Sequence, residues 1–349
     1  MTNAQRRKTP RPADAASTMR AVIQTGYGHP DAVLKHEVID RPVPGADEIL
    51  IRVRATSVNT PDLVAITGEP RVLRLRSGIR RPSVVVRGSD VAGTVAAVGR
   101  DVTELRPGDE VFGSVWNNKA IQAPGTFAEF TVAPASQVIA KPAAISFEAA
   151  AASVMSGLTA LIGIRDVAGV QPGHRVLVNG ASGGVGTFAV QIAHALGAEV
   201  TGVCSTRNVE FVRSLGARHV IDYTETDFTR GDQRYDVVLD NVMNHRPSAT
   251  VRVLAPGGVF IPNSIGTAGG LLAGLPRMAR AAVIGLRPSV SVRFITFEVD
   301  HAGLASLVRL LEGGGVSPAI DRTYGLDEAA AAVSHMLGHH ARGKVVIAG

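Results

Sequence analysis

A glycine-rich turn between a strand and a helix constrains the fold more than any other feature of this sequence. Arg175–Asn179 is a short apolar run of the kind that forms a buried parallel strand, and Thr187–Leu196 carries apolar residues at helical spacing. Gly180–Gly186, between them, contains four glycines, and Glu199–Cys204 predicts a second strand after the helix. The sequence therefore predicts a βαβ unit, whose two strands lie parallel in one sheet.

The place of the glycines in this unit predicts a site for a dinucleotide. A helix N-terminus presents free N–H groups and a partial positive charge, and both favour a phosphate. Glycine allows a tight turn there, lets a pyrophosphate approach the backbone and lets the helix pack closely on the strand. The alternative is a glycine-rich turn in an α/β domain that binds no dinucleotide. The strand, helix and second strand around the turn favour the dinucleotide site.

The end of the second strand bears on which dinucleotide is bound. An acidic residue about 20 positions past the glycines would bond the ribose 2′-hydroxyl of NAD. Cys204–Asn208 contains no Asp or Glu, whereas Ser205 and Thr206 offer hydroxyls and Arg207 offers a planar cation that can fork onto a phosphate. These side chains favour the 2′-phosphate of NADPH. The alternative is that Arg207 is a solvated residue at the start of the next helix.

Composition disfavours several classes of function. The chain has 349 residues, of which 45% are apolar, enough for two domains with cores of their own. Aromatic residues make up only 4%, and the basic residues behind the net charge of +6 are scattered, so no nucleic-acid surface is expected. The single cysteine, Cys204, excludes an intrachain disulfide and a cysteine-rich zinc site.

The sequence also bears on membranes and compartment. No apolar run reaches the length of a membrane span. Residues 1–18 are polar and basic, which is typical of a flexible tail and not of a secretion signal. The expectation is a cytoplasmic enzyme.

The pattern of predicted elements divides the rest of the chain into three segments. Residues 19–144 contain short strand patterns separated by turns with Gly and Pro, and residues 145–290 alternate strands and helices, which predicts an open parallel sheet. Residues 291–349 are expected to add a last strand, Ser291–Phe297, and then to return to the first domain. The predicted class is α/β, with a β-rich domain and a doubly wound parallel sheet. Helices are expected over Phe147–Met155, Leu158–Asp166, Val209–Leu215 and His245–Leu254.

Short motifs along the whole chain identify a family by their order. They are SVNTPD (57–62), GSDVAG (88–93), RPGDEV (106–111), GTFAE (125–129), SGLTA (156–160), the glycine-rich turn, VIDY (220–223) and HARGKVV (340–346). With them the chain resembles the zinc-independent quinone oxidoreductase branch of the medium-chain dehydrogenase/reductase superfamily. The resemblance implies a GroES-like catalytic domain, a Rossmann domain, NADPH, a homodimer, and hydride transfer to a quinone or an α,β-unsaturated carbonyl.

The expected lack of zinc rests on two positions. Zinc alcohol dehydrogenases place a cysteine near Asn59 and Thr60, and a Gly-His-Glu where this chain has Gly88–Asp90. A catalytic zinc needs about three N, S or O ligands from the protein. Both positions lack their ligand here, and the ten histidines are scattered without ligand spacing. No metal is therefore expected.

The resemblance also implies roles for single residues. Asn59 would lie near the nicotinamide and is the candidate catalytic residue, with no general acid assigned. Two of the residues that follow have an alternative to a cofactor role: Tyr223 as a packed aromatic and Arg342 as a surface charge. The implied cofactor-binding residues are Thr159 near the nicotinamide, Ser182, Gly183, Gly184 and Val185 at the pyrophosphate, Ser205 and Arg207 at the 2′-phosphate, Tyr223 beside the adenine, Asn241 at the carboxyl edge of the sheet, and His340, Ala341 and Arg342 as a closing contact.

Two segments depart from the family pattern. Met243 stands where relatives usually have glycine, and Ile261–Gly266 replaces a more glycine-rich segment. Both lie near the expected nicotinamide end, so the substrate preference does not transfer directly. Residues 267–290 are expected to form a substrate lid or a dimer surface, with a membrane contact as the weaker alternative. Two other functions stay open: a non-catalytic NADPH-binding redox sensor or interaction protein, and nucleic-acid binding through the positive charge.

Overall fold

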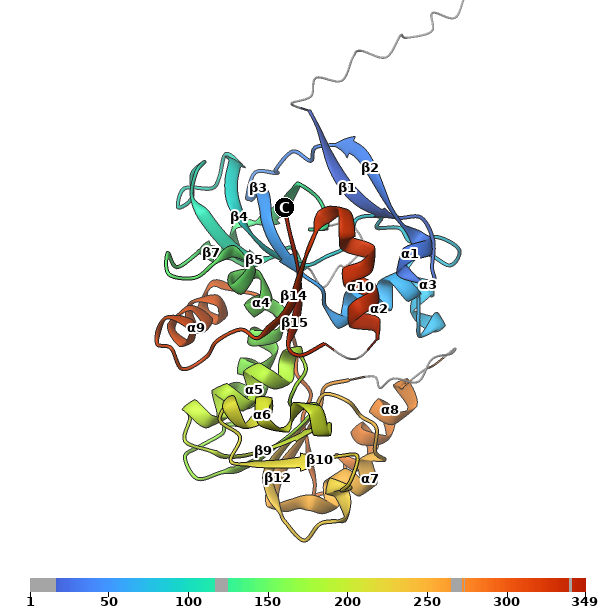
Figure 1. The fold of residues 1–349 in the computed structure, drawn as a ribbon, viewed down its shortest axis with the longest axis vertical. Helices are drawn as coiled ribbons and strands as arrows, with labels where there is room; N and C mark the ends of the chain where they lie inside the picture. The colour runs from blue at the N-terminus through green and yellow to red at the C-terminus, as the bar shows by residue number, and fades with distance from the viewer. Residues whose placement is uncertain (1–16, 117–124, 265–271, 273, 339–340) are drawn as a thin grey trace, which may run out of the picture.

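Two domains, each built on a sheet, make up the protein, and the helix α4 (Phe147–Leu161) runs between them (Figure 1). The computed structural model describes residues 17–116, 125–264, 272, 274–338 and 341–349. The sheet of one domain has six strands, and every neighbouring pair is parallel. Its order is β10 (His219–Asp222), β9 (Glu199–Cys204), β8 (Arg175–Asn179), β11 (Tyr235–Asp240), β12 (Leu254–Pro262) and β13 (Ser291–Val292).

The centre of this parallel sheet is buried on both faces. Val176, Leu177 and Val178 of β8 are fully buried, because consecutive side chains point to opposite faces and helices cover both. This is why the strand is a continuous apolar run and does not alternate. The helices of this domain are α5 (Gly184–Ala195), α6 (Val209–Ser214), α7 (Pro247–Thr250) and α8 (Leu275–Ile284).

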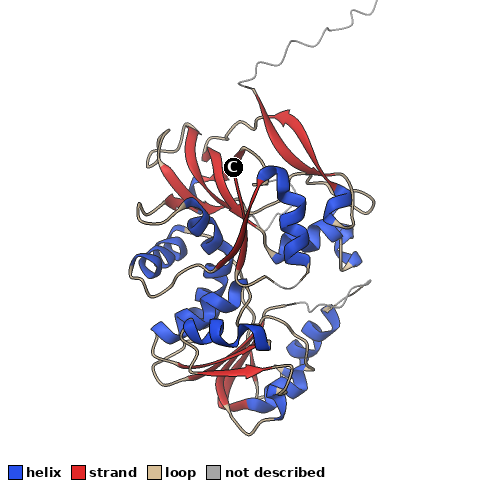
Figure 2. Cartoon of the chain, in the orientation of Figure 1, coloured by secondary structure: helices blue, strands red, loops and turns tan. Residues whose placement is uncertain are grey.

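The other domain is built on a seven-stranded sheet whose pairs are antiparallel except β14–β15 (Figure 2). Its order is β14 (Ile320–Gly325), β15 (Lys344–Ala348), β3 (Glu48–Ser57), β4 (Asp90–Val98), β5 (Glu110–Ser114) and β7 (Val138–Ala140), and β6 (Phe130–Pro134) also pairs with β3. A two-stranded sheet of β1 (Thr18–Gln24) and β2 (Leu34–Asp40) lies beside it. The helices are α1 (Pro30–Val33), α2 (Thr60–Thr67), α3 (Arg74–Ser77), α9 (His301–Glu312) and α10 (Ala329–Leu337).

The helix α4 belongs to the cores of both domains. It packs on β3, β4 and β5 on one side and on α5 on the other, and it continues as the π-helical turn Ile162–Val167. Together these residues, Phe147–Val167, form a helix long and apolar enough to cross a membrane, but 78% of it is buried inside the protein. That burial is the property of a core helix, and it explains the alanine-rich sequence, because small side chains allow close packing on both sides.

The α/β class predicted from the sequence is confirmed, while several elements differ from the prediction. The two helices expected between 147 and 166 are one continuous helix with its π-helical turn. The helix expected over His245–Leu254 is only the single turn α7 followed by a 3-10 turn, Val251–Val253. The strand expected over Ser291–Phe297 is limited to the two residues of β13, since β12 offers ladder partners only at Val259 and Phe260.

Candidate cofactor site and active site

The glycine-rich turn has a backbone that only glycine fits at two positions. Gly180 follows β8 with φ 77°, in the left-handed region. A Cβ on Gly186 would lie 2.0 Å from the carbonyl oxygen of Gly180, so a side chain there would displace the turn. Gly183 caps α5, and Gly184 and Val185 form the first turn of that helix. The free N–H groups of this turn can therefore meet an anion.

The segment before β15 lies against this turn. The N–H of Gly343 donates to the carbonyl oxygen of Ser182 at 2.8 Å, and Gly183 and Gly343 form an isolated parallel bridge. Ala341 is half-buried and Arg342 is exposed on the same segment. The structure thus brings Ala341 and Arg342 to the glycine-rich turn, while His340 lies outside the described residues.

The side chain of Arg342 reaches the backbone of Arg207 at the end of β9. The guanidinium Nη2 of Arg342 donates to the carbonyl oxygen of Arg207 at 3.0 Å. Both side chains are exposed, and Ser205, half-buried, precedes them at the end of the strand. The guanidinium of Arg342 therefore lies at the end of β9, where a 2′-phosphate is expected.

Tyr223 follows β10 and lies next to this group. Its N–H donates to the carbonyl oxygen of Cys204 at 3.0 Å, and 56% of the residue is exposed. A packed aromatic would be buried, so the exposure disfavours the packing alternative. The ring is available to flank a base.

The sequence prediction missed two polar residues here. Asn208 is buried and donates from Nδ2 to Ser182 Oγ at 3.1 Å and to Ser205 Oγ at 3.4 Å, so it connects the glycine-rich turn to the end of β9. Its Oδ1 has no hydrogen-bond partner within the described part of the chain. The signal in the sequence was an amide side chain shortly after the predicted strand Glu199–Cys204. Its unsatisfied oxygen can accept a hydrogen bond from a ligand hydroxyl.

The second missed residue is Asp222, the acid at the end of β10. It accepts from the N–H and the hydroxyl of Thr224 at 2.9 and 2.7 Å. The hydroxyl of Thr206 is the main cause that lowers the pKa of this carboxyl, so it carries a negative charge. The acid therefore sits one strand further along the sheet than the position where an NAD-binding acid is expected.

Asn241 lies at the carboxyl edge of the sheet, as expected for a ligand site. Its Nδ2 donates to the carbonyl oxygen of Asn179 at 3.2 Å, and its Oδ1 accepts from Asn263 Nδ2 at 2.8 Å. Asn179 in turn donates to Asp240 Oδ1 at 2.7 Å. This amide network fixes the ends of β8, β11 and β12 beside the glycine-rich turn.

The backbone at Met243 has the conformation that glycine adopts most easily, which explains why relatives usually have glycine there. Its φ is 57°, the one positive value among the described non-glycine residues. Its N–H donates to Asp240 Oδ1 at 2.8 Å, and Arg277 Nη1 donates to its carbonyl oxygen. The side chain is buried in the core beneath β11 and β12, so burial offsets the cost of the left-handed backbone. The departure is thus accommodated by packing.

Asn59 lies in a buried polar cluster that the sequence did not predict. Lys344, the first residue of β15, donates from Nζ to Asn59 Oδ1 and to the carbonyl oxygen of Val58. Asn59 Nδ2 donates to Asp90 Oδ2 at 2.8 Å, and Ser57 Oγ donates to the same oxygen at 2.6 Å. The Asn59 amide therefore connects a cation to an anion, and all of these side chains are buried.

A second carboxylate, Asp62, belongs to the cluster. It accepts from the N–H groups of Asn59 at 2.9 Å and of Gly88 at 3.1 Å. Burial raises its pKa to about 6, against the lowering effect of these two bonds. Burial also raises the pKa of Asp90 and lowers the pKa of Lys344, while each charge opposes the shift of the other. The signal in the sequence was a lysine and an aspartate that begin apolar strands.

The cluster reaches the cofactor turn through α4 and β15. A Cβ on Gly184 would lie 3.0 Å from Ser156 Oγ and 3.1 Å from Lys344 Cδ, so both side chains approach the start of α5. Thr159, one turn further along α4, is buried at 8% exposure. Gly343 and Lys344 are consecutive, so β15 joins the phosphate turn to Asn59 directly.

Metal-ligating side chains do not gather anywhere in the described ranges: no group of three or more His, Cys, Asp or Glu could hold an ion. At the position of the zinc dehydrogenases' ligands, Ser89 and Asp90 are turned toward Asn59, with Asn59 Nδ2 3.4 Å from Ser89 Oγ. The chemistry of this cluster is that of an internal ion pair bridged by an amide. That the protein needs no metal remains a prediction.

Comparisons with known proteins identify the family. Residues 45–143 match the alcohol dehydrogenase GroES-like domain, and residues 215–347 match the family described as zinc-binding dehydrogenase. The chain is 32% identical to the chloroplastic quinone-oxidoreductase QR1 of Triphysaria versicolor, over 95% of this chain and 99% of that protein. It is 33% identical to the 2-methylene-furan-3-one reductase of Solanum lycopersicum, over 95% and 79%.

A solved structure shows the same fold. The mycobacterial protein Rv1454c, described as complexed with NADPH, superposes with a TM-score of 0.77 at 28% identity and covers 95% of this chain and 100% of its own. The β-rich domain is thus GroES-like and the parallel sheet is Rossmann-like. The chain belongs to the quinone oxidoreductase-like branch of the medium-chain dehydrogenase/reductase superfamily.

Proposed function

We propose that the protein is an oxidoreductase that transfers hydride from a nicotinamide dinucleotide to a quinone or to the activated C=C bond of an α,β-unsaturated carbonyl. Relatives named for both kinds of acceptor support this. The observation that carries the proposal is that Gly343, which bridges to the glycine-rich turn, is followed directly by Lys344, which donates to Asn59. It connects the expected pyrophosphate site to the Asn59 cluster of the other domain through two consecutive residues.

The residues fit the dinucleotide. The free N–H groups of the first turn of α5 suit a pyrophosphate, and a Cβ at Gly183 would meet nothing closer than 3.5 Å, so this approach is open. The unpartnered Oδ1 of Asn208 suits a ribose hydroxyl, and Tyr223 suits a base. When bound, the nicotinamide supplies the hydride.

Within this proposal the chain's own residues position the reactants. The polar atoms of Asn59 are bonded to Lys344 and Asp90, so its amide is held in one orientation and is not free to transfer a proton. We therefore assign Asn59 to positioning and not to acid catalysis. Asp62 accepts two backbone N–H bonds and is buried, so it is not the proton donor either. The proton then comes from water or from a nearby hydroxyl.

NADPH is proposed over NADH because Arg207 follows β9 and the guanidinium of Arg342 donates to its carbonyl oxygen there. Arg207 and Arg342 can each fork onto a 2′-phosphate, whereas Asp222 is the one acid of the described site on that side. Asp222 stays ionised while it accepts from Thr224, so the two arginines must outweigh its repulsion of a phosphate.

A test of the function combines two measurements. Fluorescence titration gives the affinities for NADPH and NADH, and oxidation of the bound cofactor is followed with a panel of quinones and enones. Turnover with at least one acceptor of either class supports the proposal. Tight NADPH binding with no turnover on the whole panel would favour the non-catalytic sensor instead.

We also propose a homodimer. The edge strand β13 is only two residues long, and Val283 and Leu286 of the adjoining α8 segment are 64% and 82% exposed. A second copy would cover this edge across a two-fold axis. Light scattering should give a dimer for the wild type and a smaller mass for Leu286→Glu, with Leu75→Glu, an exposed leucine in α3, as the control. A monomeric wild type contradicts the proposal.

Compartment and metal content remain predictions. One relative is chloroplastic, so the cytoplasmic location expected from the sequence needs fractionation of the source cells. Independence from metal needs elemental analysis together with activity after chelation. One zinc per chain, lost along with activity on chelation, would overturn the prediction that no metal is needed.

A further inference from the structure

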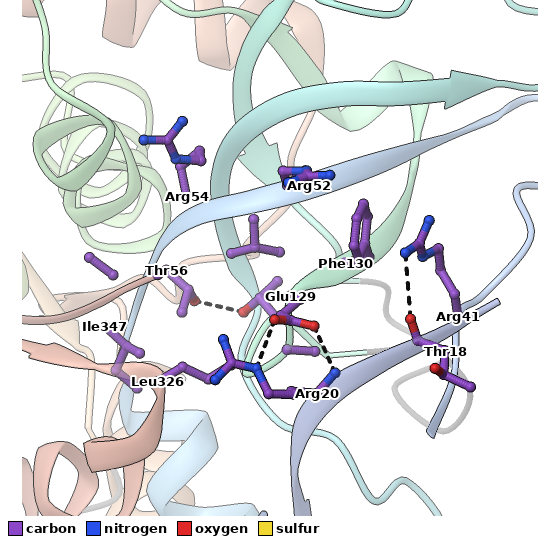
Figure 3. A pocket seen from close by; sticks show the side chains of 15 residues that line it. Thr18, Arg20, Arg41, Arg52, Arg54, Thr56, Glu129, Phe130, Leu326 and Ile347 are labelled. Atoms are coloured by element: carbon purple, nitrogen blue, oxygen red, sulfur yellow. Dashed lines mark hydrogen bonds and ion pairs between the residues drawn. The ribbon is translucent and has the colours of Figure 1, made fainter. Parts of the chain in front are cut away.

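A cavity on the GroES-like domain, away from the glycine-rich turn, is lined by arginines (Figure 3). Its volume is about 420 Å³, within the range of small-molecule sites. Its walls come from β1, β3, β6 and the end of β15. Among the described lining residues, one, Glu129, is acidic and four are arginines, namely Arg20, Arg41, Arg52 and Arg54.

Only one of the four guanidinium groups is hydrogen-bonded to the acid within the described lining. Arg20 donates from its N–H and from Nε to the two carboxylate oxygens of Glu129, both at 2.8 Å. The bond from the Arg20 N–H is the main cause that lowers the pKa of Glu129, so the acid is ionised and already occupied. Arg41, Arg52 and Arg54 form no ion pair in the described part of the chain, although the charge of Arg41 also lowers the pKa of Glu129.

Two of the unpaired cations share one aromatic ring. The guanidinium carbons of Arg41 and Arg52 lie 3.9 and 5.1 Å from the centre of the Phe130 ring. Arg41 Nη2 donates only to the carbonyl oxygen of Thr18, at 3.5 Å, and its Nε is buried without a partner. Two like charges held at one ring repel each other, and the ring offsets only part of that cost.

Two of the cations lie on the same side of the sheet as the Phe130 ring. Arg52 and Thr56 of β3 both line the cavity, while the guanidinium of Arg54, which follows an irregularity of the strand at Val53, lies 5.2 Å from the centre of the Phe147 ring of α4. Figure 3 shows Arg20, Arg41 and Arg52 around the cavity, with Leu326 and Ile347 on the apolar side. The cavity therefore offers unpaired guanidinium groups beside an apolar wall.

We propose that this cavity binds a small phosphorylated compound, a phosphomonoester or diphosphate whose organic part contacts the apolar wall. Guanidinium groups fork onto phosphate oxygens, and a dianion would relieve the repulsion between Arg41 and Arg52. A simple carboxylate carries one negative charge, which is too little for the two cations, Arg41 and Arg52, that share the Phe130 ring. The site does not depend on the proposed oxidoreductase function, since none of its residues lies at the glycine-rich turn.

The test uses inorganic pyrophosphate as the probe and the full chain saturated with its dinucleotide, so that the glycine-rich turn cannot bind the probe. Calorimetry at fixed ionic strength compares the wild type with Arg52→Gln and Arg41→Gln. Arg100→Gln, an exposed arginine of the same domain that pairs with Asp101, controls for net charge. Loss of one charge-assisted bond should weaken binding about tenfold or more in each of the first two variants, and little in the control.

Several outcomes would overturn the proposal. These are no heat of binding in the wild type, equal weakening in Arg100→Gln, or binding of a single-stranded oligonucleotide but not of pyrophosphate through the same arginines. Arg52 is an exposed strand residue, so Arg52→Gln should fold as the wild type does. Its melting temperature and its turnover should be unchanged, which separates loss of this site from loss of the enzyme.

Discussion

Lys344→Met should destabilise the protein strongly, although it replaces a charge with an apolar side chain of similar length. Lys344 is fully buried, and its positive charge is connected through the Asn59 amide to Asp90, with Asp62 nearby. Without it, the two carboxylates stay in the core with no cation. Removal of one partner from a buried charged pair costs about 3–5 kcal/mol. The melting temperature should fall on the order of 10 °C.

Thermal and guanidinium unfolding measure the effect, and two variants control it. Lys35→Met changes an exposed lysine of β2 whose Nζ meets only the Asp31 carbonyl oxygen at 3.4 Å, so it should change stability by less than about 0.5 kcal/mol. The double variant Lys344→Met with Asp90→Asn removes both charges and should recover much of the loss. If Lys344→Met costs no more than the Lys35 variant, or the double variant is worse than the single one, then the cluster is not held by charge.

Three further predictions concern the cofactor, the pH and the strained backbone. Arg207→Glu should weaken NADPH about ten- to hundredfold relative to NADH, through loss of a charge-assisted bond; an unchanged ratio in fluorescence titration would assign the specificity elsewhere. Asp62 has a folded pKa of about 6, above its ordinary 3.8. The folded state therefore binds the Asp62 proton more tightly than the unfolded state does. The free energy of unfolding should fall by roughly 3 kcal/mol as pH rises from 3.8 through about 6. Asp62→Asn should flatten that slope in guanidinium titrations, and an unaltered slope would contradict this reading. Met243→Gly relieves about 1 kcal/mol of backbone strain but empties a core position worth about 2–5 kcal/mol, so it should be less stable on chemical unfolding; a more stable variant would refute the packing account.

The sequence predicted the parts of the fold that depend on local pattern. The βαβ unit around Gly180–Gly186 was predictable because strand, turn and helix are consecutive and each has its own signal. The strand β14 (Ile320–Gly325) was missed, because five of its six residues are at least partly exposed and its pairing partner β15 supplies the apolar face.

The charged cluster shows the limit of local pattern. Lys344 and Asn59 are 285 positions apart, and no spacing rule connects them. Asp90 and Lys344 each begin an apolar strand, which alone reads as an ordinary strand terminus. Only the sheet order, which places β15 beside β3 and β3 beside β4, brings the three side chains together.

That sheet order also constrains the path by which the chain can acquire its structure. The central pair β3–β15 closes a loop that contains the entire Rossmann sheet, so the GroES-like sheet cannot be completed until the intervening segment has compacted. The Rossmann sheet lies wholly within residues 175–292, so its pairs close shorter loops and it has no such requirement. We expect it to become protected first in pulse-labelling hydrogen exchange during refolding, with the amides of β3 and β15 protected together and last.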